Sequence, residues 1–178
     1  MSERRGGRIG VGEALRLGVF AATLLGALAG CRYSFTGGSV PPHLKTIAIP
    51  IVQDQSGFGD PRLKDQLTDD LVNLFRNDNT LQLADRANAD ALLDATVTRV
   101  ADEPLVVNPG EQVSQRRITI TMHVTLTDQE KRRTMWEKDF SQWGDYPSGG
   151  GPTQRDAGIQ DAVKKLTEDI LNETVAGW

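Results

Sequence analysis

Apolar and polar residues alternate without a break along Ile118-Thr119-Ile120-Thr121-Met122-His123-Val124-Thr125-Leu126-Thr127, and this segment is the strongest indication of the fold. A period of two is typical of a β-strand that buries one face and leaves the other polar. We predict this strand over Val113 to Thr127. Asp128-Gln129-Glu130-Lys131 follows as a polar turn, and Arg133 to Trp143 returns as the partner strand of a long hairpin.

Three further segments are predicted as strands. Thr46 to Val52 alternates three isoleucines with other residues, and Leu81 to Ala84 is long enough for a brief strand. Leu92 to Val100 places Asp94, Thr96 and Thr98 on the side opposite its apolar residues. Loops are expected where Gly, Pro and polar residues gather, at Asp54 to Gly59, Glu103 to Glu111 and Gly144 to Thr153.

Two amphipathic helices complete the pattern. Asp60-Pro61 has the N-cap and the first-position proline of a helix that ends near Asn77-Asp78-Asn79. The last helix is predicted from Gln154 to Thr174. The predicted buried stripes are Leu63, Leu67, Leu71, Leu74 and Phe75 in the first helix, and Ile159, Ala162, Val163, Leu166 and Ile170 in the last. Each helix has one apolar side, so the expected fold class is α+β. It is a two-layer sandwich with both helices packed on one face of a four- to five-stranded mixed, largely antiparallel sheet.

The N-terminus resembles a removable export signal. Arginines precede an apolar run of 12 residues from Leu17 to Leu28, which is shorter than the roughly 20 residues that span a bilayer. Leu28-Ala29-Gly30-Cys31 then matches the lipobox of bacterial lipoproteins, in which the cysteine is acylated and becomes the first mature residue. We therefore predict a signal peptide over 1–30, a lipidated tether over 31–45, a single α+β domain over 46–178, and membrane attachment through lipid on Cys31. The alternative is an incidental cysteine after an ordinary signal peptide.

Composition narrows the function classes. Residues 1–30 hold four of the 20 basic and two of the 24 acidic residues, so the remaining chain has 16 and 22, a net charge of −6. An acidic domain gives no reason to expect nucleic acid as a partner. Cys31 is the only cysteine, which excludes an intramolecular disulfide.

Catalytic motifs are missing as well. The two histidines, His43 and His123, have no second histidine or cysteine at metal-ligand spacing, and neither a Gly-x-Ser-x-Gly nor a phosphate-binding loop is present. Gly149 to Gly151 is interpreted as a flexible connection. We predict that the protein is not an enzyme and needs no cofactor or metal.

Two candidate surfaces remain. The first is a threonine-rich sheet face, interpreted either as a flat, uncharged surface for a protein partner or as an ordinary solvated strand face. Its predicted partner-facing residues are Thr96, Thr98, Thr119, Thr121, His123 and Thr125. The second is basic and is interpreted either as a contact for lipid phosphate or as solubilising charge. It comprises Arg116, Arg117, Lys131, Arg132 and Arg133, at the two ends of the hairpin.

The start of the mature chain resembles the LptE family of outer-membrane lipopolysaccharide-assembly lipoproteins. The resemblance begins with Cys31-Arg32-Tyr33-Ser34-Phe35-Thr36-Gly37 and Pro41-Pro42-His43-Leu44-Lys45-Thr46-Ile47-Ala48-Ile49-Pro50. It continues through the first helix, Asp85-Arg86, Ala89-Asp90-Ala91, the strand Arg117 to Val124 and Trp136-Glu137. The family implies a non-enzymatic lipoprotein that plugs the LptD barrel, helps that barrel fold, and contacts lipopolysaccharide during its export to the outer leaflet. It also implies an outer-membrane location, lipid-anchored, on the periplasmic side or inside the partner barrel.

A periplasmic lipoprotein activator of a peptidoglycan synthase is the competing interpretation. Such activators have a similar sequence pattern: a strand, a leucine-rich helix, and then the pairs Asp-Arg and Ala-Asp. Tyr33-Ser34-Phe35 and Pro41-Pro42-His43 favour the lipopolysaccharide-assembly family.

Overall fold

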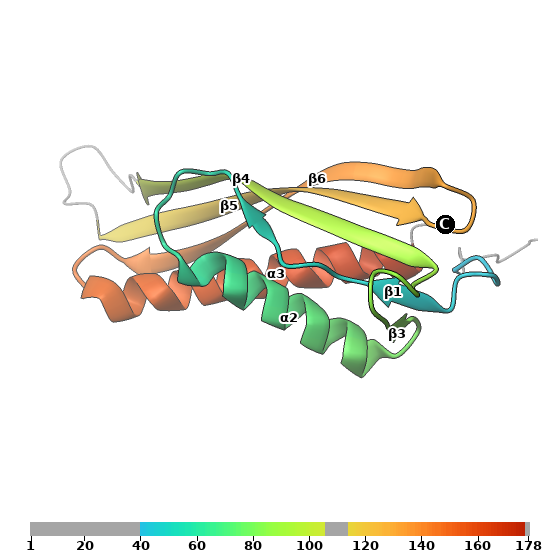
Figure 1. Cartoon of the computed structure of the whole chain (residues 1–178). Helices are drawn as coiled ribbons and strands as arrows, with labels where there is room; N and C mark the ends of the chain where they lie inside the picture. The colour runs from blue at the N-terminus through green and yellow to red at the C-terminus, as the bar shows by residue number, and fades with distance from the viewer. Residues whose placement is uncertain (1–39, 106–113, 177–178) are drawn as a thin grey trace, which may run out of the picture. The chain divides into compact units, whose positions relative to one another are not determined.

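Alternating burial along three long strands builds a sheet that two helices cover on one side (Figure 1). The computed structural model describes residues 40–105 and 114–176, all within one compact unit of residues 37–178. The described elements are β1 (Thr46–Ala48), β2 (Gln53–Asp54), α2 (Arg62–Asp78), β3 (Gln82–Leu83), β4 (Ala91–Leu105), β5 (Gln115–Asp128), β6 (Arg133–Pro147) and α3 (Gly151–Ala176). Residues 1–39, with the predicted signal peptide and Cys31, lie outside the described part.

The sheet is mixed, with the strand order β3-β1-β4-β5-β6 and with β2 also paired to β4. β1 runs parallel to β3 and β4, whereas the long strands β4, β5 and β6 are antiparallel to their neighbours. The α+β class and the mixed, largely antiparallel sheet are therefore confirmed.

The described sheet has six strands because the predicted strand Thr46 to Val52 is shorter than expected and a further short strand, β2, follows it. Pairing from Thr46 stops at Ala48 and resumes at Gln53, and Pro50 lies between the two pieces. Proline has no N–H to donate to a ladder, so pairing of the predicted strand stops before Pro50. β2 lies just beyond the predicted strand, and its second residue, Asp54, falls in the predicted loop. The sequence prediction of one continuous strand here is wrong.

Two predicted loops are partly strand. β4 extends to Leu105 and β6 extends to Pro147, since Gln115 pairs with both of these residues. The predicted loops at Glu103 and Gly144 therefore begin too early. Pro104 lies in the added part of β4. Proline is tolerated where a strand has a neighbour on one side only, and among the described strands β4 pairs only with β5 beyond Val97. The last helix likewise starts at Gly151, earlier than predicted.

The core lies between the sheet and the helices. Leu63, Leu67, Leu71 and Phe75 of α2 are buried, as predicted, while Leu74 is only partly buried. The predicted stripe of α3 is also buried. Facing them are the apolar residues of β5, all fully buried: Ile118, Ile120, Met122, Val124 and Leu126. The alternation in the opening stretch therefore divides β5 into a core side and a side that faces away from both helices.

The start of α2 agrees with its capping signal to within one residue. The helix begins at Arg62, and Pro61 before it already has helical angles. The Asp60 carboxylate accepts a hydrogen bond from the backbone N–H of Arg62 at 3.0 Å, which satisfies one of the free donors of the first turn.

Candidate interaction surface

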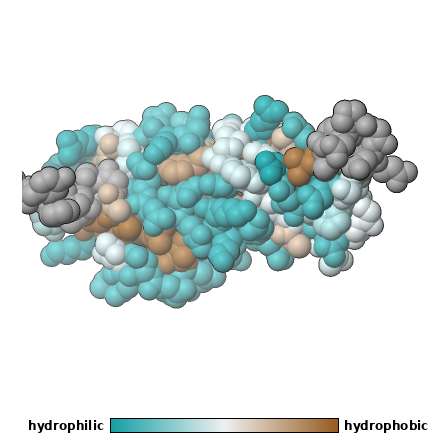
Figure 2. Space-filling view, turned by 180° about the vertical axis from the view of Figure 1, so that it is seen from behind, coloured by the Kyte–Doolittle hydropathy of each residue, from teal (hydrophilic) through white to brown (hydrophobic). Residues whose placement is uncertain are grey.

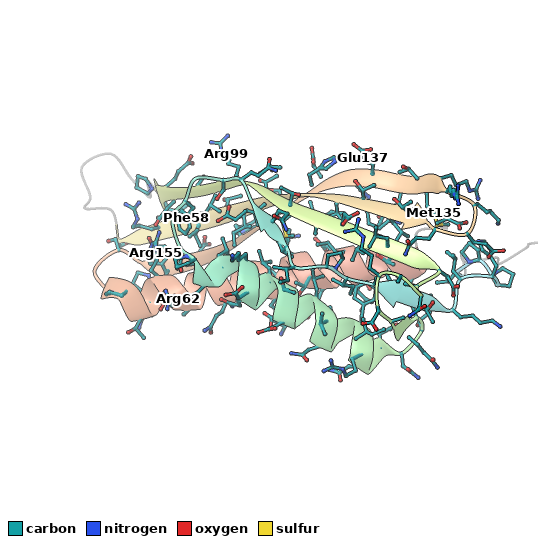
Figure 3. The ribbon with its side chains drawn as sticks, viewed as in Figure 1. Phe58, Arg62, Arg99, Met135, Glu137 and Arg155 are labelled. Atoms are coloured by element: carbon teal, nitrogen blue, oxygen red, sulfur yellow. The ribbon has the colours of Figure 1, made fainter. Side chains whose placement is uncertain are left out.

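The side of the sheet that faces away from the helices carries most of the predicted partner-facing side chains. We call it the open face. It comprises Asp94, Thr96, Arg99, Ala101 and Glu103 on β4, Arg117, Thr119, Thr121, His123 and Thr125 on β5, and Glu137, Asp139, Ser141, Trp143 and Asp145 on β6. Register places Thr96 opposite His123, which itself lies opposite Asp139. Arg99 and Glu137 project from this face away from the helices (Figure 3).

A β-bulge changes which β4 residues join the open face. The register shifts between Val97 and Arg99, so Arg99 instead of Thr98 lies opposite Thr121. Thr98 is the extra, exposed residue, and its hydroxyl donates to the backbone oxygen of Thr121 at 3.3 Å. Such a bulge reverses the alternation beyond it, and the side-chain pattern of β4 alone does not locate it.

The open face was predicted to be uncharged. It is charged in the structure, because β6 contributes carboxylates to it. His123 lies between Asp139 and Glu137, with Nδ1 at 2.8 Å from Asp139 Oδ1 and Nε2 at 3.1 Å from Glu137 Oε1. Both ring nitrogens donate at once only in the imidazolium form. The hydrogen bond to Asp139 is the main reason that the pKa of His123 is raised above its ordinary value, with Glu137 adding to the effect.

This geometry predicts a pH dependence that NMR can measure. We expect the His123 ring protons to titrate above the ordinary histidine pKa of about 6.5, and the Asp139→Asn variant to lower that pKa. Because the folded-state pKa is raised, the pair stabilises the fold fully below the unfolded-state pKa. This stabilisation is lost as pH rises through the folded-state pKa. The His123→Gln variant identifies the His123 ring signals by their disappearance. A His123 pKa at or below the ordinary value would contradict the proposed pairing with Asp139 and Glu137.

Trp143 is a surface residue that the sequence analysis missed. Its side chain lies on the open face and the residue is 42% exposed. The Arg117 guanidinium lies over the ring at 4.9 Å from the centroid and binds Asp145 through two hydrogen bonds, at 2.7 and 2.8 Å. Arg117 thereby lowers the pKa of Asp145. An exposed tryptophan held by a paired arginine has the composition of a protein interface.

Arg116 points to the other side of the sheet, toward α3. Its Nε donates to Asp102 at 2.9 Å, and Arg155 from α3 donates to the same carboxylate at 2.9 Å. Burial by itself raises the pKa of Asp102, but hydrogen bonds from Tyr146, Arg155 and Arg116 outweigh it and the net shift is downward. The Arg155 guanidinium also lies over the Phe58 ring, 4.7 Å from its centroid. This cluster ties β4, β5, β6 and α3 together.

The predicted basic set therefore does not form one site. Arg116 and Arg117 point to opposite faces at one end of the hairpin, and both are paired with carboxylates. Lys131, Arg132 and Arg133 lie at the turn, at the other end. All three are exposed, and none of them forms an ion pair within the described part of the chain.

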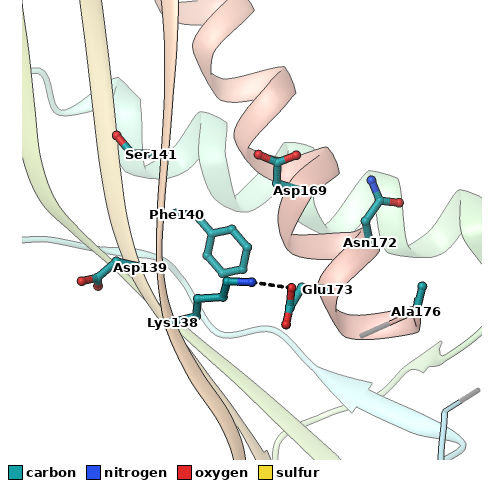
Figure 4. Close-up of a pocket in the computed structure, with 8 residues that line it drawn as sticks. All are labelled: Lys138, Asp139, Phe140, Ser141, Asp169, Asn172, Glu173 and Ala176. Atoms are coloured by element: carbon teal, nitrogen blue, oxygen red, sulfur yellow. Dashed lines mark hydrogen bonds and ion pairs between the residues drawn. The ribbon is translucent and has the colours of Figure 1, made fainter. Parts of the chain in front are cut away.

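A groove of ≈ 500 Å³ lies between β6 and the C-terminal part of α3 (Figure 4). An ion pair between Lys138 and Glu173, 2.7 Å long, spans it beside Phe140. The other two carboxylates of the lining also have partners, since Asp139 bonds to His123 and Asp169 accepts a hydrogen bond from Gln142. Across the described residues there is no cluster of three His, Cys, Asp or Glu side chains placed to hold a metal ion.

The chain forms an α+β two-layer domain with one side of its sheet left open. The surface seen from behind is mostly hydrophilic, with hydrophobic side chains gathered in a band in its lower part (Figure 2). No helix among the described residues combines the length and the apolar character needed to cross a membrane.

The chain belongs to the LptE family, whose model, described as lipopolysaccharide-assembly, matches residues 44–174. This family is non-enzymatic, which confirms the prediction that the protein is not an enzyme. It places the chain among envelope lipoproteins that take part in lipopolysaccharide assembly and associate with that transport machinery. No curated protein matches the chain by sequence.

Solved structures share the fold at low sequence identity. Protein XCC0632 from Xanthomonas campestris, of family DUF330, has a TM-score of 0.57 at 15% identity, over 77% of this chain and 90% of that chain. The hypothetical protein CT253 from Chlamydia trachomatis has a TM-score of 0.57 at 10% identity, over 73% and 95%. The uncharacterized lipoprotein B from Nitrosomonas europaea has a TM-score of 0.50 at 12% identity, over 83% and 92%.

Proposed function

We propose that this protein is an outer-membrane lipoprotein that plugs an LptD-type barrel and assists its assembly. In this proposal residues 1–30 are removed, Cys31 carries the lipid, and residues 31–45 tether the domain of residues 46–178 to the membrane. The domain acts by binding, and it contacts lipopolysaccharide during export to the outer leaflet. Family membership supports the general role, and the open face supports the mode of binding.

The open face is the observation that carries the proposal. The helices cover one side of the sheet, while the other side presents threonine and serine hydroxyls, His123 and several charges. The interior of a large outer-membrane barrel is polar and its wall is rich in hydrogen-bonding groups. A polar sheet face complements such a wall, whereas an apolar face would not.

Co-purification tests the partner directly. The protein is purified by affinity from detergent-solubilised envelope, and the bound proteins are identified. Recovery of a large outer-membrane barrel supports the proposal. Recovery of a penicillin-binding protein without the barrel would instead support the peptidoglycan-synthase activator.

Charge placed on the open face tests the binding mode. We expect Thr121→Arg to leave the fold intact, because the Thr121 side chain lies outside the core, and to reduce barrel recovery by about tenfold or more. An unpaired charge buried at an interface costs about 2 kcal/mol or more. Quantitative immunoblotting of the purified complex measures the loss.

A matched control distinguishes the two faces. Gln160→Arg introduces the same side chain at an exposed position of α3, on the other side of the sandwich. It should leave barrel recovery unchanged. Normal recovery with Thr121→Arg would remove the open face from the proposal.

A further inference from the structure

The hairpin turn, the start of β1 and the loop before β4 meet at one end of the domain. Gln129 joins the turn to the loop, with its amide nitrogen donating to Ala89 O at 3.0 Å and Arg86 O at 3.2 Å. The Asp90 carboxylate of that loop accepts the backbone N–H groups of Lys45 and Thr46, both at 2.9 Å. Residues 43–45, 85–90 and 128–133 therefore form one hydrogen-bonded unit, which we call the basic tip.

The chain that follows Cys31 is attached to the basic tip through His43. His43 lies 2.8 Å from the buried Asp128 carboxylate, and the backbone N–H of Lys131 donates to the other oxygen of Asp128 at 2.8 Å. Burial raises the pKa of Asp128, but the Lys131 N–H and His43 outweigh that effect and the net shift is downward. Asp128 thus holds both the incoming chain and the hairpin turn.

The tip is cationic although the protein is acidic. Its exposed cations are Lys45, Arg86, Lys131, Arg132 and Arg133, and its exposed carboxylates are Asp85 and Glu130. Within the described residues none of the five cations forms an ion pair with a carboxylate. Asp90 and Asp128, whose pKa values are lowered, also carry negative charge, so the tip holds five basic and four acidic side chains and a net charge of +1. The tip is therefore slightly cationic, and its exposed cations outnumber its exposed carboxylates, in a protein whose net charge is −4.

We propose that the basic tip is a docking surface for the anionic phospholipid surface of the membrane that holds the lipid on Cys31. The inference rests on the proposed acylation of Cys31, and it is independent of the barrel partner. Nine residues, 31–39, precede Val40, so the chain between Cys31 and Val40 spans at most about 30 Å. Lipid phosphates attract basic residues within about a Debye length of the surface, which a short tether makes reachable. Docking turns the domain so that the tip faces the bilayer and the Asp102 cluster points away from it.

Vesicle quenching measures this orientation with the lipidated mature protein. Cys31 is acylated, so a cysteine introduced by Asn88→Cys at the tip, or by Gly149→Cys at the other end, is the only site for a fluorophore. Both positions are exposed. The vesicles contain phosphatidylcholine with or without phosphatidylglycerol, and a nitroxide on the lipid headgroup quenches any label that approaches the surface.

We expect phosphatidylglycerol to increase quenching of the label at position 88 and to leave the label at position 149 unaffected. The double variant Arg132→Glu/Arg133→Glu should reduce that increase by about half or more, and added salt should do the same. The control Lys64→Glu/Lys164→Glu makes the same change in net charge at exposed helix positions and should have no effect.

Three results with the phospholipid vesicles alone would overturn the proposal. They are equal quenching of the two labels, quenching that is insensitive to the tip variant, and protein that does not float with the vesicles at all. Quenching that appears only after lipopolysaccharide is added would assign the tip to that lipid instead, and would also overturn it. Failure to float would also contradict acylation of Cys31, whereas the other results leave the barrel proposal, which co-purification tests, unaffected.

Discussion

The Leu67→Asp variant is expected to lose the cooperative unfolding transition of the parent protein. Leu67 is fully buried in the centre of the α2 stripe and belongs to the main core cluster. The substitution removes the apolar contacts of a leucine and places a carboxylate where no partner exists, at a cost of about 5 kcal/mol or more. The whole stability of such a domain is about 5–15 kcal/mol, so most molecules should unfold. Urea titration followed by near-UV circular dichroism measures the loss.

Asn73→Asp is the matched control for this variant. It adds the same carboxylate to the same helix at an exposed position, where the side chain already accepts a hydrogen bond from Arg76. Its unfolding midpoint should remain within experimental error of the parent. A stable Leu67→Asp protein would mean that α2 does not pack on the sheet as described here.

The Gly144→Ala variant is expected to destabilise the domain by about 3 kcal/mol, the upper range for overpacking. Gly144 in β6 and Gly158 in α3 lie at a point of close contact between strand and helix. A Cβ on Gly144 would overlap the carbonyl oxygen of Gly158 and lie 2.8 Å from its carbonyl carbon. Backbone atoms cannot turn aside as a flexible side chain can, so α3 must shift. Thermal unfolding should show a decrease in Tm of about 10 °C.

Gly149→Ala is the control for the glycine prediction. A Cβ at Gly149 meets no heavy atom within 4 Å, so the substitution should be neutral or slightly stabilising. Equal stability of the two alanine variants would show that the contact between β6 and α3 is looser than described.

The site was only partly predictable from the sequence. Thr119, Thr121, His123 and Thr125 were placed correctly on one face, because alternation along a single strand is a local property. The carboxylates beside His123 were not predicted, since they belong to β6 and their position depends on cross-strand register. Arg116 and Arg117 are adjacent in sequence and were grouped together. Successive residues of a strand point to opposite faces, so the two arginines bind different carboxylates.

Periodicity could be derived from the order of residues: two helices with one apolar stripe each, a long hairpin, and therefore an α+β sandwich with one polar sheet face. These features follow from interactions between residues a few positions apart. Three features emerged only in the folded protein: the bulge at Thr98, the close contact of Gly144 with Gly158, and the hydrogen bonds that join Lys45 to Asp90 and Arg86 to the hairpin turn. Each of these depends on which distant segments pack together, because register and close packing are set by the partner segment and not by the local pattern.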